Sequence, residues 1–468
     1  MPLTDLDVAK KAAAVERKTL YNSMIDGMAF SVMVGFGESM VIPFALALHA
    51  TDFQVGILAT LPILLGAFMQ LCGANLLSLT RDRKKIILPF VFLQALTWPL
   101  MVVLPLGFAA IAVWVLIAIF CVYFMFGQAV SPVWNSLMAD LVQKKERGRY
   151  FGRRASLAGL IALSTTLAAG FYLNFFSKEH VIAGFAGLFI TAMVFRFVSL
   201  YYLKKMHEPR YIWEEEKEQS FFFFLRNITK TNFGRFTLFM AAMNFAVFVA
   251  SPFFTPYMLN TLGFGYLLFT VINATSALAS IITVRRWGAS LDLFGDKTVL
   301  GLASLLVCFV PLLWVISPDP GYLLAIQLLS GFAWGGFNLV TANFAYDSLE
   351  PGKIARYIAY QNILVGIMVV LGGITGSIII EYSGVAILGS AYLFVFLVST
   401  ALRLLAISLF LPKIKEPKEA QQITERQLFF NMMTIRPLQG VIHDMVVLGH
   451  KVGGGGATNR NNKIPLKT

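Results

Sequence analysis

The sequence predicts an all-α polytopic membrane protein with twelve transmembrane helices in two pseudo-symmetric six-helix bundles. Three observations predict this fold: the composition, a series of long apolar runs, and an internal repeat. Of the 468 residues, 57% are hydrophobic and only 13% are charged, about half the charged share of a typical soluble protein. So few charges cannot cover a water-exposed surface, and so much apolar surface excludes a disordered chain.

The apolar runs are long enough to cross a hydrocarbon layer about 30 Å thick, which takes roughly 20 helical residues. Continuous runs of this length exclude a β-barrel, whose strands alternate over about ten residues. The first run is too long for a signal peptide and lacks a small-residue cleavage site. The predicted spans are about 24–48, 54–77, 86–106, 109–138, 155–176, 181–203, 235–259, 264–284, 298–317, 321–346, 357–380 and 386–411.

Lysine and arginine gather in alternate connections, and this asymmetry orients the helices. The set that includes both termini holds nearly all of these cations, whereas the other set holds only Lys178. We therefore predict cytoplasmic N- and C-termini, in an inner or plasma membrane. The net charge of +13 is explained by these connections, so no nucleic-acid partner is expected.

Corresponding residues recur at a nearly constant offset along the chain. Asp140 is followed nine residues later by Arg149, and Asp347 by Arg356, with an offset of 207 in both cases. Other matches are Arg196 with Arg403, Glu208-Pro209 with Glu416-Pro417, and Pro43-Phe44 with Pro252-Phe253. This pattern indicates a duplicated six-helix unit, an architecture in which secondary transporters place the substrate site between the repeats.

The repeat divides the chain into five predicted parts. They are a cytoplasmic N-terminal segment 1–23, an N-terminal six-helix bundle 24–203, a central cytoplasmic linker 204–234, a C-terminal six-helix bundle 235–411 and a cytoplasmic tail 412–468. The linker carries an acidic run at 214–218, followed by an apolar segment at 221–225 that suits the membrane interface.

Two stretches resemble the major facilitator superfamily, and the resemblance covers about residues 20–412. The stretch 288–297, between the eighth and ninth spans, is similar to the superfamily pattern G-x-x-x-D-(R/K)-x-G-(R/K)-(R/K). Its duplicate at 81–85 keeps the basic cluster but lacks the motif aspartate, and 138–154 resembles the superfamily's loop between helices 4 and 5. The resemblance implies a twelve-helix transporter in which helices 1, 4, 7 and 10 line a central cavity.

Charged residues at the cytoplasmic helix ends are predicted to form a gate. A carboxylate at one helix end can pair with an arginine at the next helix start. The pair would form when that side closes and break when it opens, as a conformational switch requires. The alternative is that these charges only orient the chain and cap its helices. The predicted gate residues are Asp82, Arg83, Asp140, Arg147, Arg149, Asp292, Lys297, Asp347 and Arg356.

Polar residues in the cavity-lining helices are candidates for substrate binding or proton coupling. Glu38 lies about fourteen residues into the first span, roughly 21 Å along a helix. A carboxylate at that depth costs several kcal/mol unless it is paired, hydrated or protonated. It can carry a proton, or bind a cationic substrate or metal ion; alternatively it is water-exposed near the outer mouth. The candidates are Glu38, Asp26, Gln128, Trp134, Asn135, Asn244, Tyr257, Trp334 and Asn338.

Three charged residues near the inner helix ends have a structural alternative. Asp26 is either an interfacial cap or a cavity residue. Arg196 and Arg403 are interpreted as structural, because a long arginine side chain can reach the interface from several residues inside a span.

The sequence therefore predicts a secondary active transporter that moves a small solute by alternating access, driven by protons through Glu38 or by the solute's own gradient. The alternatives are a facilitator or efflux permease without proton coupling, or a non-transporting receptor or assembly factor derived from the fold. The expected partners are the lipid bilayer, a small-molecule substrate, and protons or another coupling ion. A monomer is expected.

An enzyme is not predicted. The five histidines lie in predicted loops or tails, and no H-E-x-x-H, G-x-S-x-G or Walker P-loop pattern occurs. The three cysteines each lie in an apolar run, which excludes a cysteine-built metal site. Neither a metal nor another cofactor is expected.

Overall fold

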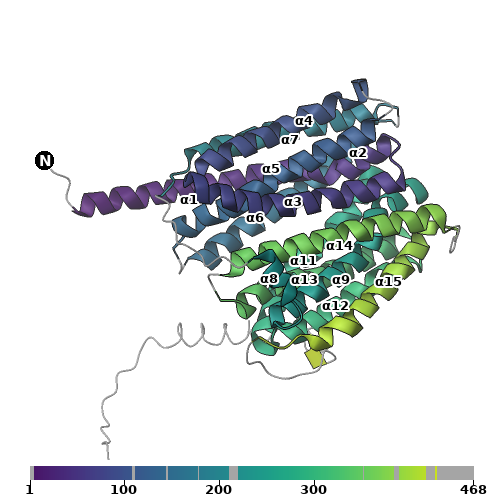
Figure 1. Ribbon diagram of the computed structural model, residues 1–468. Coiled ribbons are helices and arrows are strands. Elements are labelled where there is room, and N and C mark those ends of the chain that lie inside the picture. The colour runs from purple at the N-terminus through teal and green to yellow at the C-terminus, as the bar shows by residue number, and fades with distance from the viewer. Residues whose placement is uncertain are drawn as a thin grey trace, which may run out of the picture.

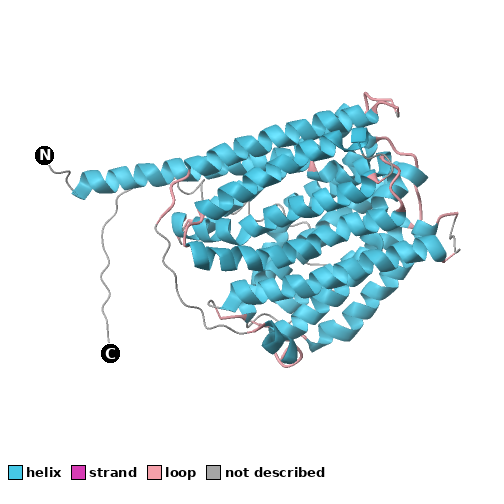
Figure 2. Cartoon of the chain, turned by 45° about the horizontal axis from the view of Figure 1, so that its top comes forward, coloured by secondary structure: helices cyan, strands magenta, loops and turns pink. Residues whose placement is uncertain are grey.

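The computed structural model describes residues 5–107, 111–143, 146–177, 179–209, 220–350, 353–383, 389–417 and 427–428. Within this part, twelve helices are long and apolar enough to cross a membrane, as the sequence predicts. They run side by side in two groups, one coloured purple to teal and the other teal to yellow (Figure 1). The connections gather at the two ends of the helices (Figure 2). Lys178, the acidic run 214–218 and residues 429–468 of the tail lie outside the described residues.

The first half packs as one bundle, in which α1 lies against α6 and α7, and α5 against α3 and α4. Its elements are α1 (Asp5–Phe36), η1 (Glu38–Met40), α2 (Val41–Ala47), α3 (Asp52–Thr80), α4 (Lys84–Gly107), α5 (Ala112–Leu141), α6 (Arg147–Leu173) and α7 (Val181–Lys205).

The second half repeats this arrangement after the short helix α8 (Phe221–Arg226). Its elements are α9 (Asn232–Ala250), η2 (Ser251–Phe253), α10 (Phe254–Pro256), η3 (Tyr257–Thr261), α11 (Tyr266–Phe294), α12 (Asp296–Trp314), α13 (Pro320–Ser348), α14 (Ile354–Tyr382), α15 (Ala391–Phe410) and η5 (Leu411–Lys413). The two halves meet where α3 packs along α14 and α6 along α11.

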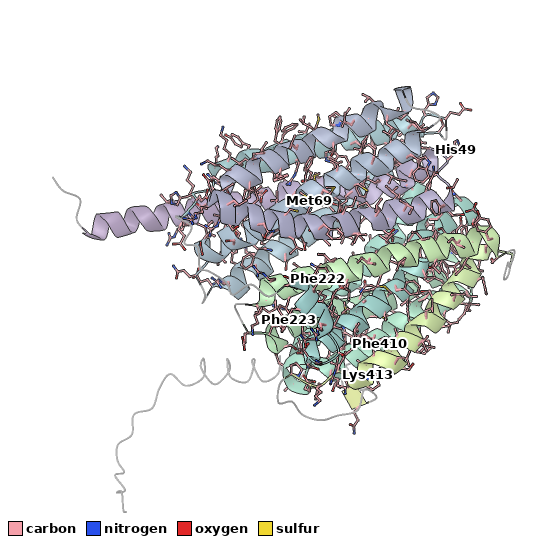
Figure 3. All side chains as sticks on the ribbon, viewed as in Figure 1. His49, Met69, Phe222, Phe223, Phe410 and Lys413 are labelled. Atoms are coloured by element: carbon pink, nitrogen blue, oxygen red, sulfur yellow. The ribbon has the colours of Figure 1, made fainter. Side chains whose placement is uncertain are left out.

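The bundle has two ends, and His49 and Lys413 lie toward opposite ones (Figure 3). We call the end with the start of α1 and with Lys413 the terminal end, and the end with His49 the opposite end. The α8 side chains of Phe222 and Phe223, 78% and 53% exposed, belong to the apolar segment that the sequence predicts for the membrane interface.

The first span of each half breaks before it reaches the opposite end. α1 gives way to the 3₁₀ turn η1, and α9 gives way to the 3₁₀ turn η2. Pro43 and Pro252 explain the breaks, because proline has no N–H for the helical bond to the residue four positions earlier. At Gly37 the break also lets the backbone approach Trp98, since a Cβ there would lie 2.4 Å from the indole. The repeated Pro-Phe pair thus has a repeated structural consequence.

Several helices extend beyond the predicted spans: α1 already begins at Asp5, and α6 and α11 are also longer. α6 begins at Arg147 instead of near 155, which places Arg154 in its second turn. α11 continues to Phe294, so the 288–297 motif is mostly helical and turns only at Gly295, where φ is +80°. Glycine adopts that φ without strain. The apolar runs underestimate these helices because arginine is a good helix former whose charge can leave the hydrocarbon layer.

The Glu-Pro pairs that follow α7 and α15 perform the same structural role. Glu208 accepts hydrogen bonds from the backbone N–H groups of Arg83 and Lys84 at 2.7 and 3.3 Å. Glu416 accepts two such bonds at the start of α12, at 2.8 and 2.9 Å. The first N–H groups of a helix have no partner within it. The chain leaving each half therefore returns to cap the third span of that half.

We expect Glu208→Ala and Glu416→Ala each to lower stability by about 1–2 kcal/mol, because the capped N–H groups lose a charged acceptor. Thermal unfolding of the purified protein in detergent would show a lower melting temperature for both variants. Glu350→Ala is the control, since Glu350 pairs at 2.7 Å with Lys353 in an exposed position where an ion pair adds little. An unchanged melting temperature in both cap variants would contradict the capping role.

Candidate functional site

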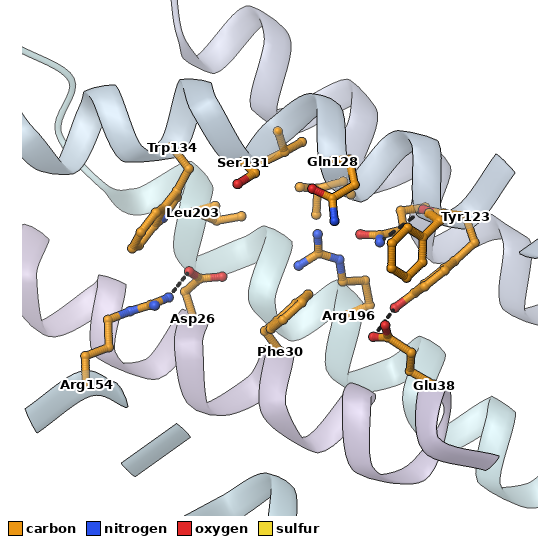
Figure 4. A pocket seen from close by; sticks show the side chains of 15 residues that line it. Asp26, Phe30, Glu38, Tyr123, Gln128, Ser131, Trp134, Arg154, Arg196 and Leu203 are labelled. Carbon is orange, nitrogen blue, oxygen red and sulfur yellow. Dashed lines mark hydrogen bonds and ion pairs between the residues drawn. The ribbon is translucent and has the colours of Figure 1, made fainter. Parts of the chain in front are cut away.

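A cavity of about 280 Å³ lies among the helices of the first half. Its walls come from α1, α4, α5, α6 and α7, together with η1 (Figure 4). Four charged side chains line it: Asp26, Glu38, Arg154 and Arg196. Four aromatic side chains line it as well: Phe30, Tyr123, Phe124 and Trp134. Charged groups thus share a small volume with apolar rings at membrane depth.

Asp26 is 4% exposed, and both of its carboxylate oxygens are engaged. Oδ2 accepts a hydrogen bond from Arg154 at 3.3 Å, which is also an ion pair (Figure 4). Oδ1 accepts from the Ser199 hydroxyl at 2.6 Å, and that hydroxyl accepts from Arg196 at 2.9 Å. Asp26 is therefore a cavity residue and not a cap at the membrane interface. Its bonds to Arg154 and Ser199 connect it to α6 and α7.

Glu38 is the second carboxylate of the cavity, and it lies on the 3₁₀ turn where α1 breaks. Its Oε2 accepts a hydrogen bond from the Tyr123 hydroxyl at 3.2 Å (Figure 4). It is partly buried, and no ion pair to it is found in the described part of the chain. A carboxylate at this depth without a bonded cation can take up and release a proton.

Arg196 of α7 is 4% exposed and points into the cavity (Figure 4). Its guanidinium carbon lies 5.0 Å from the centroid of the Phe30 ring. Its Nε–H has no hydrogen-bond acceptor among the described residues. Two other buried atoms of this cavity also lack a partner there, Gln94 Oε1 and Trp134 Nε1.

The cavity contains four of the nine candidates for substrate binding or coupling: Asp26, Glu38, Gln128 and Trp134. The sequence does not indicate that Arg154, Arg196 and Gln94 also line this cavity. Arg154 looks like one more cation of a cytoplasmic cluster, and Arg196 like a side chain reaching the interface. The available signal was the unusual depth of Arg196 in its span.

The other five candidates do not line this cavity. Asn135 and Asn338 are exposed, and the Asn244 amide donates to the carbonyl of the preceding helical turn at 2.8 Å. Tyr257 is 3% exposed and packs in an aromatic cluster of the second half. Trp334 packs against a neighbouring phenylalanine at 5.5 Å. The structure therefore does not bring the candidates of both halves together in this cavity.

A chain of amide hydrogen bonds connects the cavity wall to the second half. Gln128 accepts from Gln70 of α3 at 2.7 Å, and Gln70 in turn accepts from Asn362 of α14 at 2.9 Å. A movement of α14 against α3 would therefore act on a side chain that lines the cavity.

The two halves pack closely toward the opposite end. A Cβ on Gly56 of α3 would lie 3.0 Å from a carbonyl oxygen of α14, and one on Gly170 of α6 would lie 2.0 Å from Thr270 Oγ1 of α11. The hydroxyl of Tyr392 donates to Asp52 across the halves at 2.7 Å. At the terminal end of α6, nothing in the described part lies within 4 Å of a Cβ on either glycine of its first two turns.

The predicted gate residues pair differently from the expectation. Asp140 pairs with Arg83, the residue directly before α4, and not with Arg149, which is exposed. Arg83 is 1% exposed and also donates to Ser136 at 3.2 Å. Arg147 donates to the carbonyl groups at the end of α5. All of these contacts join elements of the same half. Arg147 can cap α5 because α6 starts close to the end of that helix.

The remaining gate residues are spread over the terminal end. Asp82 pairs with Lys85 at 3.2 Å, Asp292 is exposed, and the backbone N–H of Lys297 is bonded to the cap of α12. Asp347 and Arg356, the repeat mates of Asp140 and Arg149, are both half-buried. A gating role for the nine residues stays a prediction.

Solved transporter structures resemble this fold. A mutant of the nucleoside transporter NupG matches with a TM-score of 0.67 and 13% identity, over 86% of this chain and 100% of that chain. The D-xylose-proton symporter matches with a TM-score of 0.65 and 12% identity, over 88% and 100%. An inward-facing, unoccupied bacterial homolog of the human lysosomal transporter Spinster matches with a TM-score of 0.57 and 16% identity, over 87% and 99%.

At these identities the structural matches establish the fold. No curated protein sequence matches the chain. The family model of the Major Facilitator Superfamily matches residues 27–285 and 236–447, which together span most of the sequence. The twelve helices, the duplicated halves and this match lead to one conclusion: the chain belongs to the major facilitator superfamily.

Proposed function

We propose that this protein is a secondary active transporter that moves a small solute across the membrane by alternating access, coupled to protons through Glu38. Membership of the superfamily supports transport. The observation that carries the coupling is a carboxylate on a broken helix in a membrane-depth cavity, bonded to the Tyr123 hydroxyl.

Protonation of Glu38 can control the conformational change, because an ionised carboxylate is costly to enclose. When the carboxylate is ionised, the Tyr123 hydroxyl donates to it and the cavity keeps contact with water. Closing both ends around an ionised group removes it from water and costs several kcal/mol. Protonation removes that charge, so the enclosed intermediate between the two open states becomes accessible.

The packing of the halves supports alternating access. The two bundles, 24–203 and 235–411, are in close contact toward the opposite end through Gly56 and Gly170. At the terminal end, no described residue lies within 4 Å of a Cβ placed on Gly148 or Gly152 of α6. With the cytoplasmic termini that the charge distribution predicts, we assign this arrangement to an inward-facing state. A rocking motion of one bundle against the other would exchange these contacts.

Reconstitution into liposomes tests the function. A thermal-shift screen first identifies a stabilising solute, because a bound ligand raises the melting temperature. We expect an imposed pH gradient to drive accumulation of that solute, and a protonophore to abolish it. Equal flux with and without the gradient would exclude proton coupling and leave a facilitator. Binding without any flux would instead favour a receptor or assembly factor.

A further inference from the structure

Arg403 of the second half is held as a structural arginine. It lies 207 residues after Arg196 and is 2% exposed. Its Nε donates to Ser399 at 3.1 Å, its Nη1 to the Val307 carbonyl at 2.8 Å and its Nη2 to the Val247 carbonyl at 3.5 Å. Every nitrogen of this guanidinium therefore has an acceptor, and the side chain ties α15 to α12 and α9.

Arg196 differs from its repeat mate. Its Nη1 donates to Ser199 at 2.9 Å, whereas its Nε–H has no acceptor among the described residues. The side chain is nevertheless 96% buried, since its exposed fraction is 4%. A buried charged donor without an acceptor is costly. The arginine that lines the cavity is therefore the one whose hydrogen bonds are incomplete.

The other charged side chains of the cavity do not complete the hydrogen bonds of Arg196. Arg154 is bonded to Asp26, and Glu38 is bonded to the Tyr123 hydroxyl. Two arginines and two carboxylates give this cavity no net charge when both carboxylates are ionised. If Glu38 takes up a proton, one positive charge remains, and a bound monoanion would neutralise it.

The rest of the lining suits a small molecule with an apolar part. Phe30 lies under the guanidinium at 5.0 Å, and Phe124 and Trp134 contribute further ring surface. Trp134 Nε1–H and Gln94 Oε1, which have no hydrogen-bond partner among the described residues, supply one donor and one acceptor. The volume of about 280 Å³ is near the lower limit of small-ligand sites.

We propose that the cavity binds a small organic anion whose carboxylate or phosphate group pairs with Arg196, and that this anion and the proton on Glu38 occupy the cavity together. As a statement about transport this rests on the proposed function, but anion binding itself does not require flux. Guanidinium groups match the oxygens of carboxylate and phosphate in geometry and charge.

Binding to the purified full chain in nanodiscs provides the test, with benzoate, phenyl phosphate and the neutral isostere benzamide as probes. We expect benzoate or phenyl phosphate to bind in titration calorimetry and to raise the melting temperature, and benzamide to do neither. Which of the two anions binds decides between a carboxylate and a phosphate substrate. The anion should bind more tightly at low pH, and this pH dependence should vanish in Glu38→Gln.

Variants of the two matched arginines separate binding from folding. Arg196→Gln should weaken anion binding by at least about tenfold, the factor of one charge-assisted hydrogen bond, and Arg196→Lys should restore part of it. Arg403→Gln should lower the melting temperature and leave the affinity unchanged. If Arg403→Gln does not fold, Arg403→Lys provides the same comparison.

Three results would overturn the proposal: no binding of either anion, binding of benzamide as tight as that of benzoate, or unchanged affinity in Arg196→Gln. These results are distinct from failure of the transport function. Anion binding without flux in liposomes would remove the transport function and keep the site. Proton-driven flux of a neutral solute without anion binding would keep the transport function and remove the anion site.

Discussion

Glu38→Gln is expected to abolish accumulation of the solute against its gradient, to the level of liposomes without protein. Glutamine keeps the size of the side chain and an acceptor for the Tyr123 hydroxyl, now bonded at 3.2 Å, but it cannot take up or release a proton. The enclosed state no longer requires protonation, so exchange of labelled for unlabelled solute should continue. We therefore expect this variant to lose accumulation but to keep solute exchange.

The measurement compares uptake driven by a pH gradient with solute exchange in the same liposomes. Glu350→Gln serves as the matched control, because Glu350 is an exposed carboxylate that pairs with Lys353 outside the cavity. Retained accumulation in Glu38→Gln would show that another group carries the proton. Loss of both activities would mean that the variant is defective in binding or folding, and the melting temperature distinguishes these two.

Gly170→Ala is expected to shift the protein away from the state described here. The new Cβ would lie 2.0 Å from Thr270 Oγ1, so α6 and α11 must separate at the opposite end. Overpacking of this kind costs about 1–3 kcal/mol, which changes a two-state equilibrium roughly 5–150-fold. The state that is open at the opposite end should therefore gain population, and the transport rate should fall.

Spin labels on Glu179→Cys and Ile316→Cys, in a background without native cysteines, would report the separation of the halves at the opposite end. Both positions are exposed in the structure. Gly159→Ala is the matched control on the same helix, because its Cβ would meet only a methyl group of α11 at 3.5 Å. Adding Thr270→Gly to Gly170→Ala should restore the original distances. A distance distribution unchanged by Gly170→Ala would contradict the prediction.

The fold follows from the sequence because its signals are local. A run of about 20 apolar residues is long enough to span a bilayer, and inside lipid its backbone must form a helix to satisfy its own hydrogen bonds. Pro43 and Pro252 break their helices for a reason contained in the residue itself. The helix starts were less well predicted: α6 begins at Arg147, since apolar counting ends a span at the first cluster of arginines.

The candidate site depends on contacts that no local pattern records. Asp26, Arg154 and Arg196 come from three helices of the first half and meet in one cavity. The sequence indicated Glu38 because a carboxylate stands out in an apolar span. An arginine near a helix end does not stand out, because the sequence alone is equally explained by membrane topology for Arg154 and by the membrane interface for Arg196.

The sequence by itself determined the membrane class, the twelve spans, the duplication and the superfamily, because hydropathy and repeat offsets are properties of the linear chain. The tertiary structure decided which charged side chains pair and which keep incomplete hydrogen bonds. Arg196 and Arg403 are equivalent in the repeat, yet one has acceptors for all its nitrogens and the other faces a cavity. That difference arises from packing between distant helices, which sets burial and hydrogen bonding independently of sequence position.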